Sequence, residues 1–333
     1  MHRMACSRTR AGATVLLLAL AILAVPGAYG ERGNVHRVGQ LNLGSAGGEV
    51  QPYFDTFVAA MRKLGYVEGR NFILDRRWAD GSLERLGPLA DELIALKPHV
   101  LLGNEAIAQI MRAKSTSIPI VLTSSIDPVK AGLARTLSRP GMNVTGITQL
   151  NDQLPAKHIE LMRDINPRLS RVAQLVDISA SGCRIVEEQA RLAAGRFGVT
   201  LVPYYVTTER DLEQAFTRME QDRRDVVLPC PSSLLFYHRA LLFENVRRLR
   251  IPTTSFIVAN VPDGVLFAYA TSLHENLAKA ATYVDKILKG ASASDLPIEQ
   301  PTNFELVLNL KTAKALNLAI PRSILVRAER VIE

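Results

Sequence analysis

The sequence predicts an α/β protein made of two doubly wound parallel-sheet lobes that face each other across a cleft. Short β-branched strands alternate with longer amphipathic helices from residue 35 onward, which is typical of parallel sheets covered on both faces. The alternation restarts near residues 145–152, and it contains too many strands for one compact open sheet. Composition agrees with a globular chain, because 47% of the 333 residues are hydrophobic and 22% are charged.

The first thirty residues have the order of a secretory signal peptide. Three arginines without any acidic residue precede an apolar run at 11–25, and small residues at 28 and 30 offer a cleavage site. The run is shorter than the ~20 residues of a bilayer span, so we expect cleavage rather than a retained anchor. Cys6 precedes the run, which is the wrong place for a lipid-modified mature N-terminus. The signal peptide predicts a periplasmic location. Its removal lowers the formal net charge of the chain from +8 to +5.

The first lobe is predicted from the elements between residues 35 and 149. The helix at 50–64 carries apolar side chains at a spacing near 3.6, and Gly65 ends it. Lys97 and Pro98 close the following helix. In chain order, the expected elements are strand 35–43, helix 50–64, strand 71–78, helix 83–96, strand 100–102, helix 105–113, strand 118–123 and strand 144–149.

The second lobe is predicted from a renewed alternation that begins with a helix at 155–165. It continues with strand 171–176, helix 185–197, strand 199–206, helix 212–221, strand 225–228, helix 234–249, strands 251–257 and 264–269, helix 273–288, strand 305–310 and helix 312–316. The helix at 273–288 is a candidate to return to the first lobe. We therefore expect a first lobe of 31–148 plus about 272–300, and a second lobe of 149–271 plus about 301–333. His158 and His238 are expected on helix surfaces.

The sequence lacks the motifs that mark nucleotide binding, nucleophilic catalysis and zinc binding. The turn at 44–49 does not have the G-x-G-x-x-G spacing of dinucleotide sites, and there is no P-loop, nucleophile elbow or H-E-x-x-H pair. Three cysteines cannot form a disulfide framework or a four-thiolate zinc site. We therefore expect no cofactor, no metal and no enzyme activity. Arginine clusters are interpreted as solvated helix faces, so no nucleic-acid partner is expected. Cys183 and Cys230 are equally compatible with a disulfide and with two buried free thiols.

Small polar residues directly after strands are the candidate ligand contacts. Parallel strands place these loops, and the helix N-termini that follow them, at one edge of each sheet, where free N–H groups favour a carboxylate. Hydroxyls add donors, and either Asp127 or Asp177 would accept from an ammonium group. The competing interpretation is that these residues only cap helices. The predicted ligand contacts are Ser45, Asn104, Glu105, Thr123, Ser124, Asp127, Asp177, Cys230, Ser232 and Tyr269.

A set of short motifs resembles the TrpX-like substrate-binding proteins of ABC transporters. Gly-Tyr-Val-Glu-Gly-Arg-Asn at 65–71 and Arg-Trp-Ala-Asp-Gly at 77–81 match the signature of that family, and the similarity spans residues 35–333. Further matches are Ile-Pro-Ile-Val at 118–121, Asp-Pro-Val-Lys-Ala-Gly-Leu at 127–133, Arg-Pro-Gly-Met-Asn-Val-Thr-Gly at 139–146 and Gln-Pro-Thr-Asn-Phe-Glu-Leu-Val-Leu-Asn-Leu-Lys-Thr-Ala-Lys at 300–314. The resemblance implies a type I periplasmic-binding-protein fold with two lobes, a hinge and an interlobe ligand cleft.

The resemblance also implies a function and a partner. It predicts a monomeric solute-binding protein of an ABC importer, which captures a small amino-acid-like solute and delivers it to a permease in the inner membrane. The chain departs from the family pattern at Asn104 and Glu105, at 177–180 and at Ala270. All of these positions are expected to face the cleft. The alternatives are a ligand-sensing module for a membrane receptor and a secreted α/β hydrolase or lyase that uses Asp127 or Cys230. A transcription regulator is disfavoured, because the signal peptide occupies the place of a DNA-binding headpiece.

Overall fold

The computed structural model describes residues 35–48, 50–149 and 154–333. The predicted signal peptide at 1–30 lies outside the described residues. Among the residues that the structure describes, no helix is both long enough and apolar enough to cross a membrane.

The first lobe is built on a five-stranded sheet with the strand order β2-β1-β3-β4-β5, in which every pair is parallel. Its strands are β1 (His36–Asn42), β2 (Phe72–Trp78), β3 (Val100–Gly103), β4 (Ile120–Leu122) and β5 (Val144–Gly146). The intervening helices are α1 (Gln51–Lys63), α2 (Leu83–Ala95) and α3 (Glu105–Lys114). A parallel sheet needs such crossovers, because each strand must return to the same edge before the next begins.

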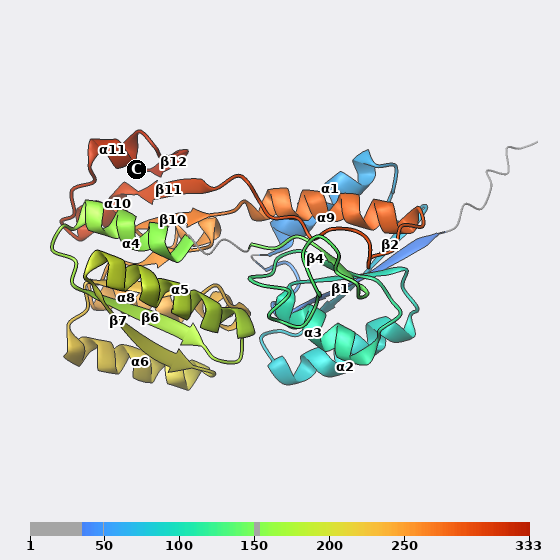
Figure 1. The fold of residues 1–333 in the computed structure, drawn as a ribbon, viewed down its shortest axis with the longest axis horizontal. Coiled ribbons are helices and arrows are strands. Elements are labelled where there is room, and N and C mark those ends of the chain that lie inside the picture. The colour runs from blue at the N-terminus through green and yellow to red at the C-terminus, as the bar shows by residue number, and fades with distance from the viewer. Residues whose placement is uncertain (1–34, 49, 150–153) are drawn as a thin grey trace, which may run out of the picture. The chain divides into compact units, whose positions relative to one another are not determined.

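Apolar side chains point to both faces of this sheet. Val100 and Leu102 pack in one cluster with residues of α1 and of α9 (Leu273–Leu288), whereas Leu101 packs in another with residues of α2 and α3. This split follows from the two-residue period of a strand. Figure 1 shows α9 lying beside α1, although nearly the whole second lobe separates the two helices in sequence.

The second lobe contains two sheets, with the orders β7-β6-β8 and β12-β11-β10-β9. A parallel bridge between Val227 and Thr253 links them. The strands are β6 (Arg171–Asp177), β7 (Thr200–Val206), β8 (Val226–Pro229), β9 (Thr254–Ser255), β10 (Phe267–Ala270), β11 (Glu305–Asn309) and β12 (Arg330–Ile332). The helices are α4 (Leu154–Ile165), α5 (Ser181–Phe197), α6 (Glu209–Asp222), α7 (Ser233–Tyr237), α8 (Arg239–Arg248), the 3-10 turn η1 (Val258–Asn260), α10 (Leu310–Ala315) and α11 (Arg322–Leu325).

The structure differs from the sequence prediction in the later part of this lobe. The expected helix at 234–249 is two helices, because His238 leaves helical geometry (φ −90°, ψ 20°). The expected strand at 251–257 is reduced to Thr254–Ser255, and α11 and β12 were not predicted. Strands β10 and β11 pair antiparallel, because the chain leaves this lobe through β10 and comes back into it through β11.

His158 is buried, so the prediction of a surface position is wrong. It lies on α4 with 1% of its surface exposed, and its ring packs 4.2 Å from that of Phe256 and 5.6 Å from that of Phe267. Its Nε2 atom lies 2.9 Å from the carbonyl oxygen of Tyr269. The ring therefore joins α4 to β10, next to the segment in which the chain leaves the second lobe.

Candidate functional site

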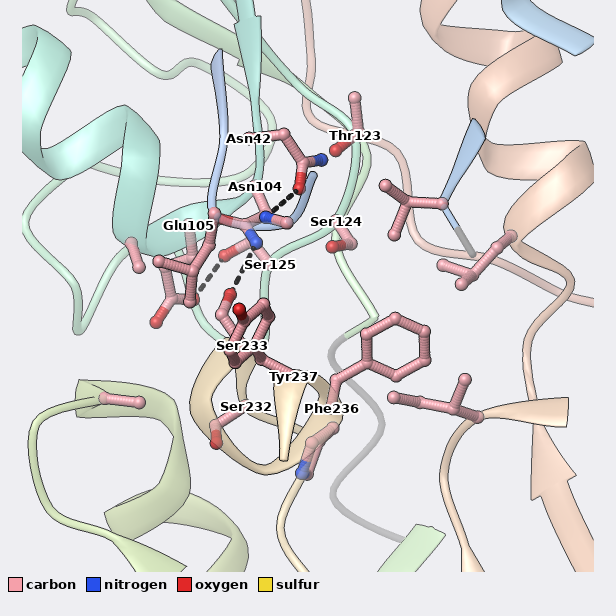
Figure 2. Close-up of a pocket in the computed structure, with 18 of the residues that line it drawn as sticks. Asn42, Asn104, Glu105, Thr123, Ser124, Ser125, Ser232, Ser233, Phe236 and Tyr237 are labelled. Carbon is pink, nitrogen blue, oxygen red and sulfur yellow. Dashed lines mark hydrogen bonds between the residues drawn. The ribbon is translucent and has the colours of Figure 1, made fainter. Parts of the chain in front are cut away.

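A pocket of about 190 Å³ lies between the strand-end loops of the two lobes. The first lobe supplies residues after β1, β3 and β4, and the second supplies residues 180–182, several residues of the segment 231–239 and Ile257. Figure 2 shows the polar side chains of the first lobe facing α7 across this space. Ligands of open parallel sheets bind at the carboxyl ends of the strands, and both lobes present that end to the pocket.

Asn104 begins α3 and also reaches the second lobe. Its Oδ1 accepts a hydrogen bond from the Ile107 amide (3.2 Å), which caps the helix. Its Nδ2 donates to the Ser233 hydroxyl at 2.9 Å. Asn104 therefore caps α3 and also lines the pocket, where it bonds the second lobe.

Glu105 is held by four hydrogen-bond donors. Its Oε2 accepts from the Ser125 hydroxyl (2.6 Å) and from the amides of Ile126 (2.8 Å) and Asp127 (3.2 Å). Its Oε1 accepts from the Ser181 hydroxyl of the second lobe at 2.9 Å. The carboxylate thus fixes the loop after β4 and forms the second direct hydrogen bond between the lobes.

The second-lobe wall is tied together by a disulfide. Cys183 and Cys230 are bonded, which resolves the alternative that the sequence left open. Cys183 follows the pocket residues Ser181 and Gly182, and Cys230 precedes the pocket residues that begin at Pro231. The bond therefore joins two of the second-lobe loops that line the pocket.

The remaining walls are largely apolar and aromatic. Tyr53 and Phe54 come from α1, and Phe236 and Tyr237 come from α7. Other apolar residues of the wall are Leu41, Leu43, Val50, Ile126, Ile257, Leu273 and Leu277. Tyr237 also donates from its hydroxyl to the Asp80 carbonyl oxygen of the first lobe (3.1 Å). A solute with a ring or a branched apolar body matches these surfaces.

Arg239 is the only basic side chain among the described residues that line the pocket. Its Nε lies 3.4 Å from an Asp263 carboxylate oxygen, and one terminal nitrogen donates to the Phe236 carbonyl oxygen (3.1 Å). The guanidinium carbon also lies 4.8 Å from the centre of the Phe236 ring. Among the described residues, at this pocket or away from it, no three His, Cys, Asp or Glu side chains gather as metal ligands would.

Six of the ten residues predicted as ligand contacts line the pocket, and four do not. Those that line it are Ser45, Asn104, Glu105, Thr123, Ser124 and Ser232. Ser45 also bonds Asp80, whose pKa is lowered first by Arg85 and then by this hydroxyl. Ser232 caps α7 by accepting from the Leu235 amide (3.1 Å).

The other four predicted contacts have partners elsewhere. Asp127 accepts from the amides of Val129 and Lys130 within its own turn, and Asp177 accepts from Ser179. Cys230 is in the disulfide, and Tyr269 stacks on Phe304 with ring centres 5.8 Å apart. None of the four lines the pocket.

Several pocket residues were missed by the sequence analysis. Asn42 ends β1 and could have been found by the same strand-end criterion that selected Ser45. Ser181 and Ser233 each lie a few residues after a strand, at the start of a helix, and were passed over for their neighbours. The aromatic residues of α1 and α7 gave no sequence signal, because apolar residues at helical spacing normally indicate core packing.

Comparison with known proteins identifies the family. The ABC transporter substrate binding protein family model matches residues 51–332, so the chain belongs to that family. The members are extracytoplasmic solute-binding proteins that work with an ABC permease, not enzymes. The alternative of a hydrolase or lyase using Asp127 or Cys230 is therefore wrong.

Individual relatives agree with this assignment. The tyrosine-binding protein of Clostridioides difficile is 24% identical over 264 residues, which is 79% of this chain and 75% of that protein. A Streptococcus pneumoniae ABC domain in complex with L-Trp has a TM-score of 0.84 at 20% identity and covers 90% of this chain and all of its own. A conserved domain protein from Vibrio cholerae has a TM-score of 0.83 at 23% identity, with the same coverage. These structures show the type I periplasmic-binding-protein fold.

Proposed function

We propose that this chain is the solute-binding component of an ABC importer, captures a small amino-acid-like solute in the interlobe pocket and delivers it to an inner-membrane permease. The observation that carries the proposal is the two-sided pocket, in which Asn104 and Glu105 of one lobe bond Ser233 and Ser181 of the other. Contacts from both lobes exist together only when the cleft is closed, so a bound solute favours closure about the hinge.

The size of the pocket limits the solute. A cavity of about 150 Å³ accommodates one benzene molecule. The pocket measures about 190 Å³, so it has room for one ring or branched apolar group and a few polar atoms. Disaccharides and peptides are larger than that. The six predicted contacts that line the pocket are proposed to surround this solute: Ser45, Asn104, Glu105, Thr123, Ser124 and Ser232.

A periplasmic location and a cleaved signal peptide belong to the same proposal. The disulfide supports an oxidising compartment, in which such bonds persist. We also propose that the protein is a monomer without a nucleic-acid partner, with lobes of 31–148 plus about 272–300 and 149–271 plus about 301–333. The mature protein from a periplasmic extract is expected to begin at Glu31, which N-terminal sequencing measures.

A ligand screen on the exported protein tests the proposal. The panel holds aromatic and branched-chain amino acids together with small carboxylates. A true ligand is expected to raise the melting temperature by mass action and to reduce the radius of gyration in solution scattering. If no compound in the panel produces either change, capture of an amino-acid-sized solute is refuted. Disaccharides are the matched control and are expected to change neither quantity.

A further inference from the structure

The pocket has two charged lining residues in the described part of the chain, and both have partners within the protein. Glu105 accepts four hydrogen bonds, whereas an ionised carboxylate offers about four acceptor sites. A bound ammonium group would have to displace the Ser181 hydroxyl or a backbone amide. Glu105 therefore functions as a support for the loop and a link between lobes.

Arg239 also has its interaction partners within the protein. Asp263 lies 3.4 Å from its Nε and compensates its charge, and the Phe236 carbonyl oxygen and ring occupy further parts of the guanidinium. Neither of the two charged residues among the described lining residues is arranged as a dedicated counter-charge for a zwitterion. This arrangement favours recognition of the polar end of the solute by neutral groups.

Three neutral side chains are suited to this recognition. The hydroxyls of Thr123 and Ser124 make no side-chain hydrogen bond to any described residue. Asn42 uses its Oδ1 to accept from the Gly44 amide (2.9 Å), which fixes the amide group and leaves Nδ2 as a donor. Thr123 and Ser124 follow β4, Asn42 ends β1, and only β3 lies between these strands. Figure 2 shows all three residues in the first-lobe part of the pocket.

Two hydroxyls and an amide N–H form a donor-rich group that suits a carboxylate, because hydrogen bonds to an ionised acceptor are the stronger ones. The opposite part of the pocket offers Phe236 and Tyr237 to an apolar body. We infer that the pocket selects ring-bearing or branched carboxylates through Asn42, Thr123 and Ser124 and does not recognise an α-amino group. This inference rests on the proposed function and narrows its solute class, so that a desamino carboxylate is as good a ligand as the corresponding amino acid.

Matched triplets of compounds test the inference on the exported protein by titration calorimetry. L-phenylalanine, 3-phenylpropanoate and phenethylamine differ only in the amino and carboxyl groups, as do L-leucine, 4-methylpentanoate and isopentylamine. Within a triplet that binds, the desamino carboxylate is expected to bind at least as tightly as the amino acid, within about three-fold, and the amine is expected not to bind. An amino acid that binds more than three-fold tighter, or an amine that binds as well as the acid, overturns the inference.

Substitutions distinguish the residues that bind the ligand from Glu105, which holds the loop after β4 in place. Thr123→Val and Ser124→Ala are expected to weaken a carboxylate ligand by roughly 10- to 150-fold, as for a lost bond to a charged group. Thr282→Val, on the exposed side of α9, is the control and is expected to leave the affinity unchanged. Glu105→Gln is expected to weaken the amino acid and its desamino analogue by the same factor. A loss confined to the amino acid shows that Glu105 binds the ammonium group and refutes the inference.

Binding of the triplets separates failure of the proposed function from failure of the narrower inference. If amino acids bind and desamino carboxylates do not, the proposed function stands and the inference falls. If no member of any triplet binds, the solute class of the proposed function falls, and the inference falls with it.

Discussion

The buried ring of His158 is expected to make the free energy of unfolding depend on pH. The carbonyl oxygen of Tyr269 can only accept, so Nε2 carries the proton in the neutral ring. The other nitrogen, Nδ1, is buried and has no hydrogen-bond partner in the described part of the chain. Protonation would bury a charged ring with an unpaired N–H. Burial therefore lowers the pKa of His158 to about 4, against an ordinary value of 6.5, although the bond to Tyr269 opposes the shift.

The sign and size of the effect follow from linkage. The unfolded chain takes up a proton at His158 below pH 6.5, and the native protein does so only near pH 4. The contribution to stability is therefore complete above pH 6.5 and is lost as the pH falls toward 4. The difference between the pKa of 6.5 in the unfolded chain and the pKa of about 4 in the native protein corresponds to roughly 3 kcal/mol in total. Between pH 8 and pH 5 the expected loss is about 2 kcal/mol.

Urea unfolding at pH 8, 7, 6 and 5 measures this loss. His158→Gln keeps an N–H donor for the Tyr269 carbonyl oxygen but does not titrate. It is expected to be less stable than the wild-type protein at pH 8 and to lose about 2 kcal/mol less between pH 8 and pH 5. Other groups, including His36 with a pKa that burial also lowers, titrate in both proteins and cancel in the difference. Parallel pH profiles for the two proteins would refute the reasoning.

Two further predictions concern the second-lobe wall of the pocket. A methyl group on Gly182 would lie 2.7 Å from the Cβ of Ile126 in the other lobe, which is too close for the lobes to meet as they do. Gly182→Ala is therefore expected to lower ligand affinity by at least about 10-fold. The urea midpoint is not expected to fall, because alanine favours the helix more than glycine does. Gly195→Ala on the same helix meets no atom within 4 Å and is its control; equal affinities for both variants would contradict the close approach of the lobes. Replacing Cys183 and Cys230 together by alanine is expected to cost about 4 kcal/mol of unfolding free energy, from the 47-residue separation of the pair. An unchanged urea midpoint for the double variant would contradict that estimate.

The sequence contained most of the information about the fold. Buried strands such as β1 and β6 and periodic helices such as α1 and α9 were found almost to their ends, because hydrophobic period and glycine stops are local signals. The predictions of secondary structure failed where tertiary contacts, rather than the local sequence, determine the conformation. The strand expected at 251–257 forms a ladder only over the two residues of β9, because pairing with a neighbouring strand sets its length. The three residues of β12 are too few for a recognisable pattern, and the break at His238 has no glycine or proline to mark it.

The site could be predicted only in part, for a physical reason. Strand-end position places a residue at the correct edge of a sheet, and this was enough to find Thr123, Ser124 and Asn104. It does not determine which hydrogen bonds the side chain makes. Asp127 and Asp177 satisfy amides of their own turns, as such residues do by default, and they therefore never reach the pocket. Distinguishing the two outcomes requires the positions of neighbouring backbone groups, which no single sequence contains.

The contacts between lobes have an energetic consequence for the solute. Asn104–Ser233, Glu105–Ser181 and Tyr237–Asp80 join residues of opposite lobes, so all three bonds would be lost on opening of the cleft. At about 1 kcal/mol for each such bond, together they favour the closed form by roughly 100-fold. A ligand shifts an equilibrium only by its differential affinity for the two states. Because the protein itself supplies part of the closing free energy, the proposed solute, held by Asn42, Thr123, Ser124 and an apolar wall, would need few further contacts to complete closure.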